Sequence, residues 1–167
     1  MKKYLGILFL LTAIMYGCKI NYTFTGASVS PVDKTFSVDF FTNNAPLFQP
    51  TLSQTFTEGL KDKISSQTRL SLISGGGDLH FEGEITNYSS GPISVQNAEM
   101  ASMNRLTITV KVKYSNKNDP KQNYEQNFTQ YEDYAATSSL SSVEDELIGK
   151  IVVKLTEDIF NKTLANW

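Results

Sequence analysis

Apolar and polar residues alternate along three stretches of the chain, and a period of two is typical of half-buried strands. The first stretch covers residues 34–41, where Phe36 and Val38 fall on one side. The second covers residues 79–85, directly after a turn of three glycines. The third, residues 106–114, is the longest alternation in the chain and predicts a central strand.

A weaker and mostly polar strand is predicted over residues 124–135, after the polar turn at 115–121. The last two strands would then form an antiparallel hairpin. Residues 87–103 show little periodicity, and Pro92 would remove a hydrogen-bond donor from a central strand. The sequence therefore predicts the end of a strand and a loop over residues 87–103.

Two stretches have helical spacing instead. Residues 51–67 begin with a capping-box pattern at Thr51 and Gln54, and their apolar residues recur every fourth position. A second helix is predicted from Ser141, with Glu144 as its capping partner, to about residue 164. The order β-α-β-β-β-α predicts an α+β fold, in which two amphipathic helices cover one face of a roughly four-stranded, mainly antiparallel sheet. The other face would be polar.

The N-terminal region looks like an export signal. Residues 1–17 combine two lysines with an uncharged run that is too short to span a bilayer, as in a secretory signal peptide. Gly17 and Cys18 resemble the lipobox of bacterial lipoproteins, in which the cysteine becomes the lipidated first residue. An ordinary signal peptide with a chance cysteine is the alternative. We expect a lipidated Cys18 with a tether over residues 18–33, and a single domain over residues 34–167.

Removal of residues 1–17 takes away Lys2 and Lys3 and leaves 13 basic against 17 acidic residues, a formal net charge of −4. A chain of this length buries enough surface in one core to fold without a disulfide or a metal. Its mild acidity argues against a nucleic-acid partner, which needs a dense positive surface.

Candidate catalytic residues are few. His80 is the single histidine, and no serine or cysteine nucleophile can be identified beside it in sequence. Glu82 and Glu84 point to the same side of one strand and could form a glycosidase pair, although such spacing is common on solvated strands. No cluster has metal-ligand spacing. The sequence predicts a binding or assembly protein with no catalytic residue, cofactor or metal.

Several blocks of the chain resemble one family. They are the lipobox, "VDFFTNNAP", "PTLSQTFTEGLKDKISSQT", "GDLHFEGEITNY", "NRLTITVKVKYSNKNDPK", "YEQNFTQYEDY" and "VEDELIGKIVVKLTEDIFN". This combination resembles the LptE family of lipopolysaccharide-assembly lipoproteins, in the form found in Bacteroidetes. The resemblance implies a non-enzymatic lipoprotein that plugs an LptD-like outer-membrane β-barrel and helps to insert lipopolysaccharide into the outer leaflet. A polar sheet face suits a polar barrel interior.

The resemblance also implies contact with lipopolysaccharide, whose phosphates would call for basic side chains. The candidates are Arg105, Lys111, Lys113, Lys117 and Lys121. Alternatively, these residues solvate a hairpin and prevent edge-to-edge pairing. The residues after Cys18 lack the acidic run that resembles a surface-export signal, so we expect an outer-membrane, lipid-anchored and periplasm-facing protein. A transport-auxiliary or small-ligand-binding lipoprotein without a barrel partner, and a glycan hydrolase using Glu82 and Glu84, are the competing hypotheses.

Overall fold

The computed structural model describes residues 29–47, 49–93 and 103–165. The predicted signal peptide and the predicted lipid attachment site Cys18 lie outside these residues. The described elements, in chain order, are β1 (Thr35–Val38), β2 (Thr42–Asn43), α2 (Leu52–Gln67), β3 (Ser71–Leu72), β4 (Leu79–Pro92), β5 (Met103–Asn116), a short 3-10 helix (Pro120–Gln122), β6 (Tyr124–Ala135) and α3 (Leu140–Leu164).

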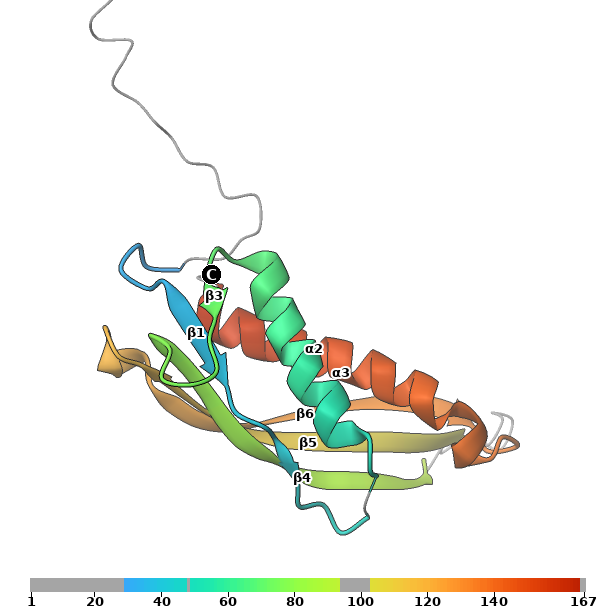
Figure 1. The fold of residues 1–167 in the computed structure, drawn as a ribbon. Coiled ribbons are helices and arrows are strands. Elements are labelled where there is room, and N and C mark those ends of the chain that lie inside the picture. Colours follow the sequence, from blue (N-terminus) through green and yellow to red (C-terminus); the bar gives the residue numbers. More distant parts are fainter. Residues whose placement is uncertain (1–28, 48, 94–102, 166–167) are drawn as a thin grey trace, which may run out of the picture.

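The predicted α+β architecture is confirmed, because both helices lie on one side of a single sheet (Figure 1). The sheet has six strands in the order β3-β1-β4-β5-β6, with β2 paired to β4 beside β1. The prediction of four strands missed β2 and β3, whose two residues each are too short to show a period. The long ladders β4–β5 and β5–β6 are antiparallel, whereas β1, β2 and β3 pair in parallel.

The prediction of a loop from residue 87 was wrong, since β4 continues to Pro92. A bulge between Ile85 and Asn87 shifts the register of the β4–β5 ladder. One extra residue moves the following side chains to the opposite faces, so Tyr88 is buried although its position breaks the earlier alternation. Pro92 is tolerated because it is the last residue of the strand.

Both predicted capping boxes were also wrong. The Thr51 side chain forms no cap bond at the start of α2. Its place is taken by Oε1 of Gln49, which accepts hydrogen bonds from the backbone N–H groups of Thr51 and Leu52 at 2.7 and 2.9 Å. Helix α3 begins at Leu140, earlier than the pattern at Ser141 predicted, with Ser139 at its N-cap position.

The hydrophobic core lies between the helices and the sheet. Phe41 and Phe56 meet edge to face, with ring centroids 4.9 Å apart, and both are fully buried. Helices α2 and α3 approach closely at Gly59, where an added Cβ would lie 2.9 Å from Cγ1 of Val152. The described helices include none that is long and apolar enough to cross a membrane.

Candidate functional site

The face of the sheet opposite the helices is polar, as the sequence predicted. Strand register aligns its side chains in rows, in which Lys113 faces Glu82 and Glu125, and Lys111 faces Glu84 and Asn127. The predicted members of this face are Ser37, Asp39, Glu82, Glu84, Thr107, Thr109, Lys111, Lys113, Asn127 and Thr129; Ser37 departs from the prediction, because its side chain is fully buried. Within residues 29–165, both helices pack on the other side, and no described element covers these rows. We call this surface the uncovered face.

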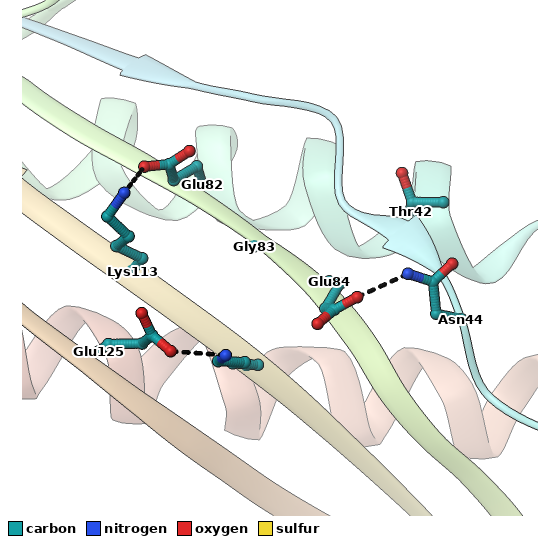
Figure 2. A pocket seen from close by; sticks show the side chains of 8 residues that line it. Thr42, Asn44, Glu82, Gly83, Glu84, Lys113 and Glu125 are labelled. Carbon is teal, nitrogen blue, oxygen red and sulfur yellow. Dashed lines mark hydrogen bonds and ion pairs between the residues drawn. The ribbon is translucent and has the colours of Figure 1, made fainter.

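One half of the uncovered face is charged and internally paired. Nζ of Lys113 lies 2.7 Å from Oε1 of Glu82, and Nζ of Lys111 lies 2.5 Å from Oε1 of Glu125. Glu84 accepts a hydrogen bond of 2.6 Å from Nδ2 of Asn44. Figure 2 shows these three pairs. Their side chains line a shallow depression of about 310 Å³. Hydrogen bonding to Lys113 lowers the pKa of Glu82, and hydrogen bonding to Glu125 and Glu82 raises the pKa of Lys111 and Lys113, which favours the charged form of these three groups.

The other half of the uncovered face consists mainly of small hydroxyl and amide groups. The hydroxyls of Thr109 and Thr129 are 2.9 Å apart across β5 and β6. At the far end, Arg105 donates two hydrogen bonds to Asp133, at 2.7 and 2.9 Å. Its guanidinium also lies over the Tyr131 ring, 3.6 Å from the centroid. This half can form hydrogen bonds with a polar partner and presents little net charge.

The five predicted lipopolysaccharide contacts therefore fall into two groups. The first group lies on the uncovered face and consists of Arg105, Lys111 and Lys113, each of which already forms an ion pair with a carboxylate. A phosphate could bind them only by displacing that carboxylate. Lys117 and Lys121 lie at the tip between β5 and β6, where Lys117 donates to the carbonyl oxygen of Gly76. The structure does not gather the five residues into one site.

The structure places a serine beside His80, which the sequence did not reveal. The Ser37 hydroxyl lies 2.8 Å from Nδ1 of His80, and Nε2 of His80 lies 3.4 Å from Oδ2 of Asp39. These contacts depend on the parallel pairing of β1 with β4, which joins residues far apart in sequence. Ser37 is fully buried and its oxygen accepts the Gly77 N–H, so no substrate reaches it as a nucleophile.

The carboxylates beside His80 suit neither hydrolysis nor an open metal site. A glycosidase acid needs a raised pKa, whereas hydrogen bonding to Lys113 lowers the pKa of Glu82. Ligand atoms of Asp39, His80 and Glu82 lie within 4.8 Å of one another, a cluster that sequence spacing did not suggest. Nε2 of His80 is the ring nitrogen that faces Asp39, while Nδ1 contacts Ser37, so a metal at this cluster would compete with the Lys113 ammonium for the Glu82 carboxylate. The arrangement is that of a structural hydrogen-bond network.

Solved structures share this fold at low sequence identity. A minor lipoprotein from Acinetobacter baumannii is 14% identical with a TM-score of 0.51, and the match covers 78% of this chain and 92% of that one. A hypothetical protein from Chlamydia trachomatis is 12% identical with a TM-score of 0.53, covering 78% and 95% of the two chains. At such identities the likeness concerns the fold alone. No curated protein matches the chain in sequence.

The family model named LptE, described as lipopolysaccharide-assembly, matches residues 34–163. This range includes all six strands of the sheet, helix α2 and all but the last residue of α3. The chain therefore belongs to the LptE family of lipopolysaccharide-assembly proteins, which are not enzymes.

Proposed function

We propose that this protein is an outer-membrane lipoprotein, anchored through Cys18 and facing the periplasm, that plugs an LptD-like β-barrel. In this role it helps the barrel to insert lipopolysaccharide into the outer leaflet. Membership of the LptE family supports the assembly function in general. The barrel partner, the anchor and the orientation are the specific parts of the proposal.

The uncovered face is the observation that carries the proposal. The interior of a large membrane barrel is polar, so a domain lodged there needs a surface that forms hydrogen bonds without burying unpaired charge. Paired charges at one half of the face, and hydroxyls such as those of Thr109 and Thr129 at the other, meet this requirement.

Affinity purification from native membranes tests the partnership. The protein should recover a large β-barrel in a stoichiometric complex, identified by mass spectrometry. A bulky side chain at Thr129, which is exposed on the uncovered face, should disrupt this complex without disturbing the core. Gln54→Trp, on an exposed helix position, is the matched control for Thr129→Trp.

The outcomes separate two parts of the proposal. Recovery of the wild-type protein alone, under conditions that preserve other barrel complexes, would overturn the barrel partnership. Undiminished recovery of the barrel by the folded Thr129→Trp variant would instead show that another surface makes the contact.

Lipopolysaccharide contact stays a prediction for Arg105, Lys111, Lys113, Lys117 and Lys121. The ion pairs of the first three mean that binding there would exchange one anion for another. Such exchange would make binding weak at physiological ionic strength, because a phosphate gains little over a carboxylate already in place.

A further inference from the structure

The basic residues of this domain differ in whether they form an ion pair with a carboxylate. Most of them form ion pairs, on the helices as well as on the uncovered face. Among residues 29–47, 49–93 and 103–165, five basic residues form no ion pair with a described carboxylate: Lys34, Arg69, Lys117, Lys121 and Lys162.

All five lie at the same end of the domain, where the described chain begins. Figure 1 shows the start of β1, the β5–β6 tip and the C-terminal ends of both helices together at this end. The contacts agree: the backbone N–H of Lys34 donates to the Asp78 carboxylate at 2.8 Å, and the N–H of Lys117 donates to the Asp78 carbonyl at 2.9 Å. Lys34 and Arg69 line one cavity of this end.

A second cavity at this end is lined by Lys121 and Lys162, next to Tyr124. A third cavity shares Val29 and Asp33 with the first, and Gln122 and Leu164 with the second. We call this region, with its five unpaired basic residues and residues 29–33, the tether end.

The acidic groups of the tether end are engaged within the domain. Asp33 is buried and accepts hydrogen bonds from the side-chain amides of Asn116 and Asn118. Asp78 accepts from the backbone of Lys34 and Thr35. Asp119 accepts from the 3-10 helix that follows it. Their charges remain, but the five basic side chains of the tether end outnumber these three carboxylates, whereas the whole chain has more acidic than basic residues.

Exposed aliphatic side chains lie beside these cations. Val32 is 62% exposed, two residues before Lys34. Leu72 of β3 and the following Ile73 are 46% and 37% exposed, and β3 pairs with β1 at the edge of the sheet. Single exposed aliphatic residues are ordinary, but several beside unpaired cations are typical of a surface that rests on lipid headgroups, with the aliphatic groups reaching into the interface.

We propose that the tether end is a docking surface for the anionic phospholipid headgroups of the membrane that carries the anchor. The proposal rests on the proposed lipidation of Cys18. Eleven positions separate Cys18 from Val29, and a chain of that length can reach at most about 40 Å. The tether end is therefore the part of the domain held nearest to the bilayer, where even weak attraction is effective because the anchor keeps it close.

Vesicle sedimentation tests the docking surface without the anchor. The mature chain, residues 18–167 with Cys18→Ser, is mixed with vesicles of phosphatidylcholine alone or with about 30% phosphatidylglycerol. We expect binding to the anionic vesicles, little binding to the neutral ones, and loss of binding between about 0.05 and 0.3 M salt. Each lysine at an anionic surface contributes roughly a fivefold gain in affinity, so Lys34→Gln/Lys117→Gln/Lys121→Gln should weaken binding at least tenfold.

The matched control removes the same charge elsewhere. Lys61→Gln/Lys150→Gln/Lys154→Gln changes three cations on the helices, and it should bind the anionic vesicles within about twofold of the parent chain. Equal binding to neutral and anionic vesicles would overturn the proposal, as would equal losses in the two triple variants. Binding to purified lipopolysaccharide without binding to phospholipid vesicles would also overturn it. None of these readouts depends on a barrel partner, so failure here is distinct from failure of the proposed function.

Discussion

Gly83 occupies a position in β4 where the adjacent strand leaves no room for a side chain. An added Cβ would lie 2.0 Å from the carbonyl oxygen of Lys111 and 2.6 Å from the ring of Phe41. The ring could turn aside, but the carbonyl belongs to the β4–β5 ladder. Restoring an ordinary contact would require a backbone displacement of roughly 1 Å or more in the most extensive pairing of the sheet.

We therefore expect Gly83→Ala to destabilise the fold severely. Overpacking in a core lowers the free energy of unfolding by about 1–3 kcal/mol and sometimes by more. Because the clash here is with backbone atoms, we expect Gly83→Ala to lower it by about 3 kcal/mol or more. For a domain of this size, such a loss corresponds to a fall in Tm of roughly 6–12 °C. The assay is urea denaturation followed by circular dichroism, with thermal denaturation as a second measure.

Gly149→Ala is the matched control, with the opposite expected sign. Gly149 lies in the middle of α3, and an added Cβ there meets nothing within 4 Å. Replacing an unneeded helical glycine should stabilise the protein by about 0.5–1 kcal/mol. A loss below about 1 kcal/mol for Gly83→Ala, or a destabilised Gly149→Ala, would refute the packing argument.

Three further predictions concern a hydroxyl, a carboxylate and the anchor. The buried hydroxyl of Tyr114 has no hydrogen-bond partner among the described residues, and burial raises its pKa. Tyr114→Phe should therefore leave the free energy of unfolding unchanged or raise it by up to about 1 kcal/mol. A clear loss of stability in urea denaturation would contradict this. Backbone hydrogen bonds from Lys34 and Thr35 lower the pKa of the Asp78 carboxyl below 3.8, so the ionised carboxylate should stabilise the fold fully above that pH and lose this effect as the pH falls further. Asp78→Asn should therefore reduce the dependence of the unfolding free energy on pH at the acid end. The same pH dependence in the variant and the wild-type protein would contradict this. Metabolic labelling with a fatty acid should mark the wild-type protein, and equal labelling of Cys18→Ala would exclude Cys18 as the attachment site.

The major elements could be predicted because each leaves a local periodic signal. The two helices and the strands of the β5–β6 hairpin follow directly from such periods. β2 and β3 could not be found this way, since a strand of two residues is defined by the neighbour with which it pairs. The last part of β4 was missed for a related reason: a bulge reverses the faces of the strand, and a pattern that changes phase looks like a loop.

The helix starts show a different limit. Residue types at Thr51 and Ser141 fitted the capping pattern, yet neither side chain caps a helix. At α2 the amide of Gln49 supplies the acceptor, because the turn before the helix brings it over the first N–H groups. Position in the turn decides which side chain caps, and the identity of one residue does not reveal that position.

Charge at the candidate site was the hardest feature to predict, and this has a functional consequence. Lys111 and Lys113 looked like phosphate ligands because sequence shows a basic residue without its partner. Their partners, Glu125 and Glu82, come from two other strands and depend on a register that the sequence does not show. Basic residues that remain without a carboxylate, such as Lys121, are better candidates for an external anion, because binding there needs no ion pair to be broken. A search for lipid contacts should therefore begin at the tether end and treat the uncovered face as a surface for a polar protein partner.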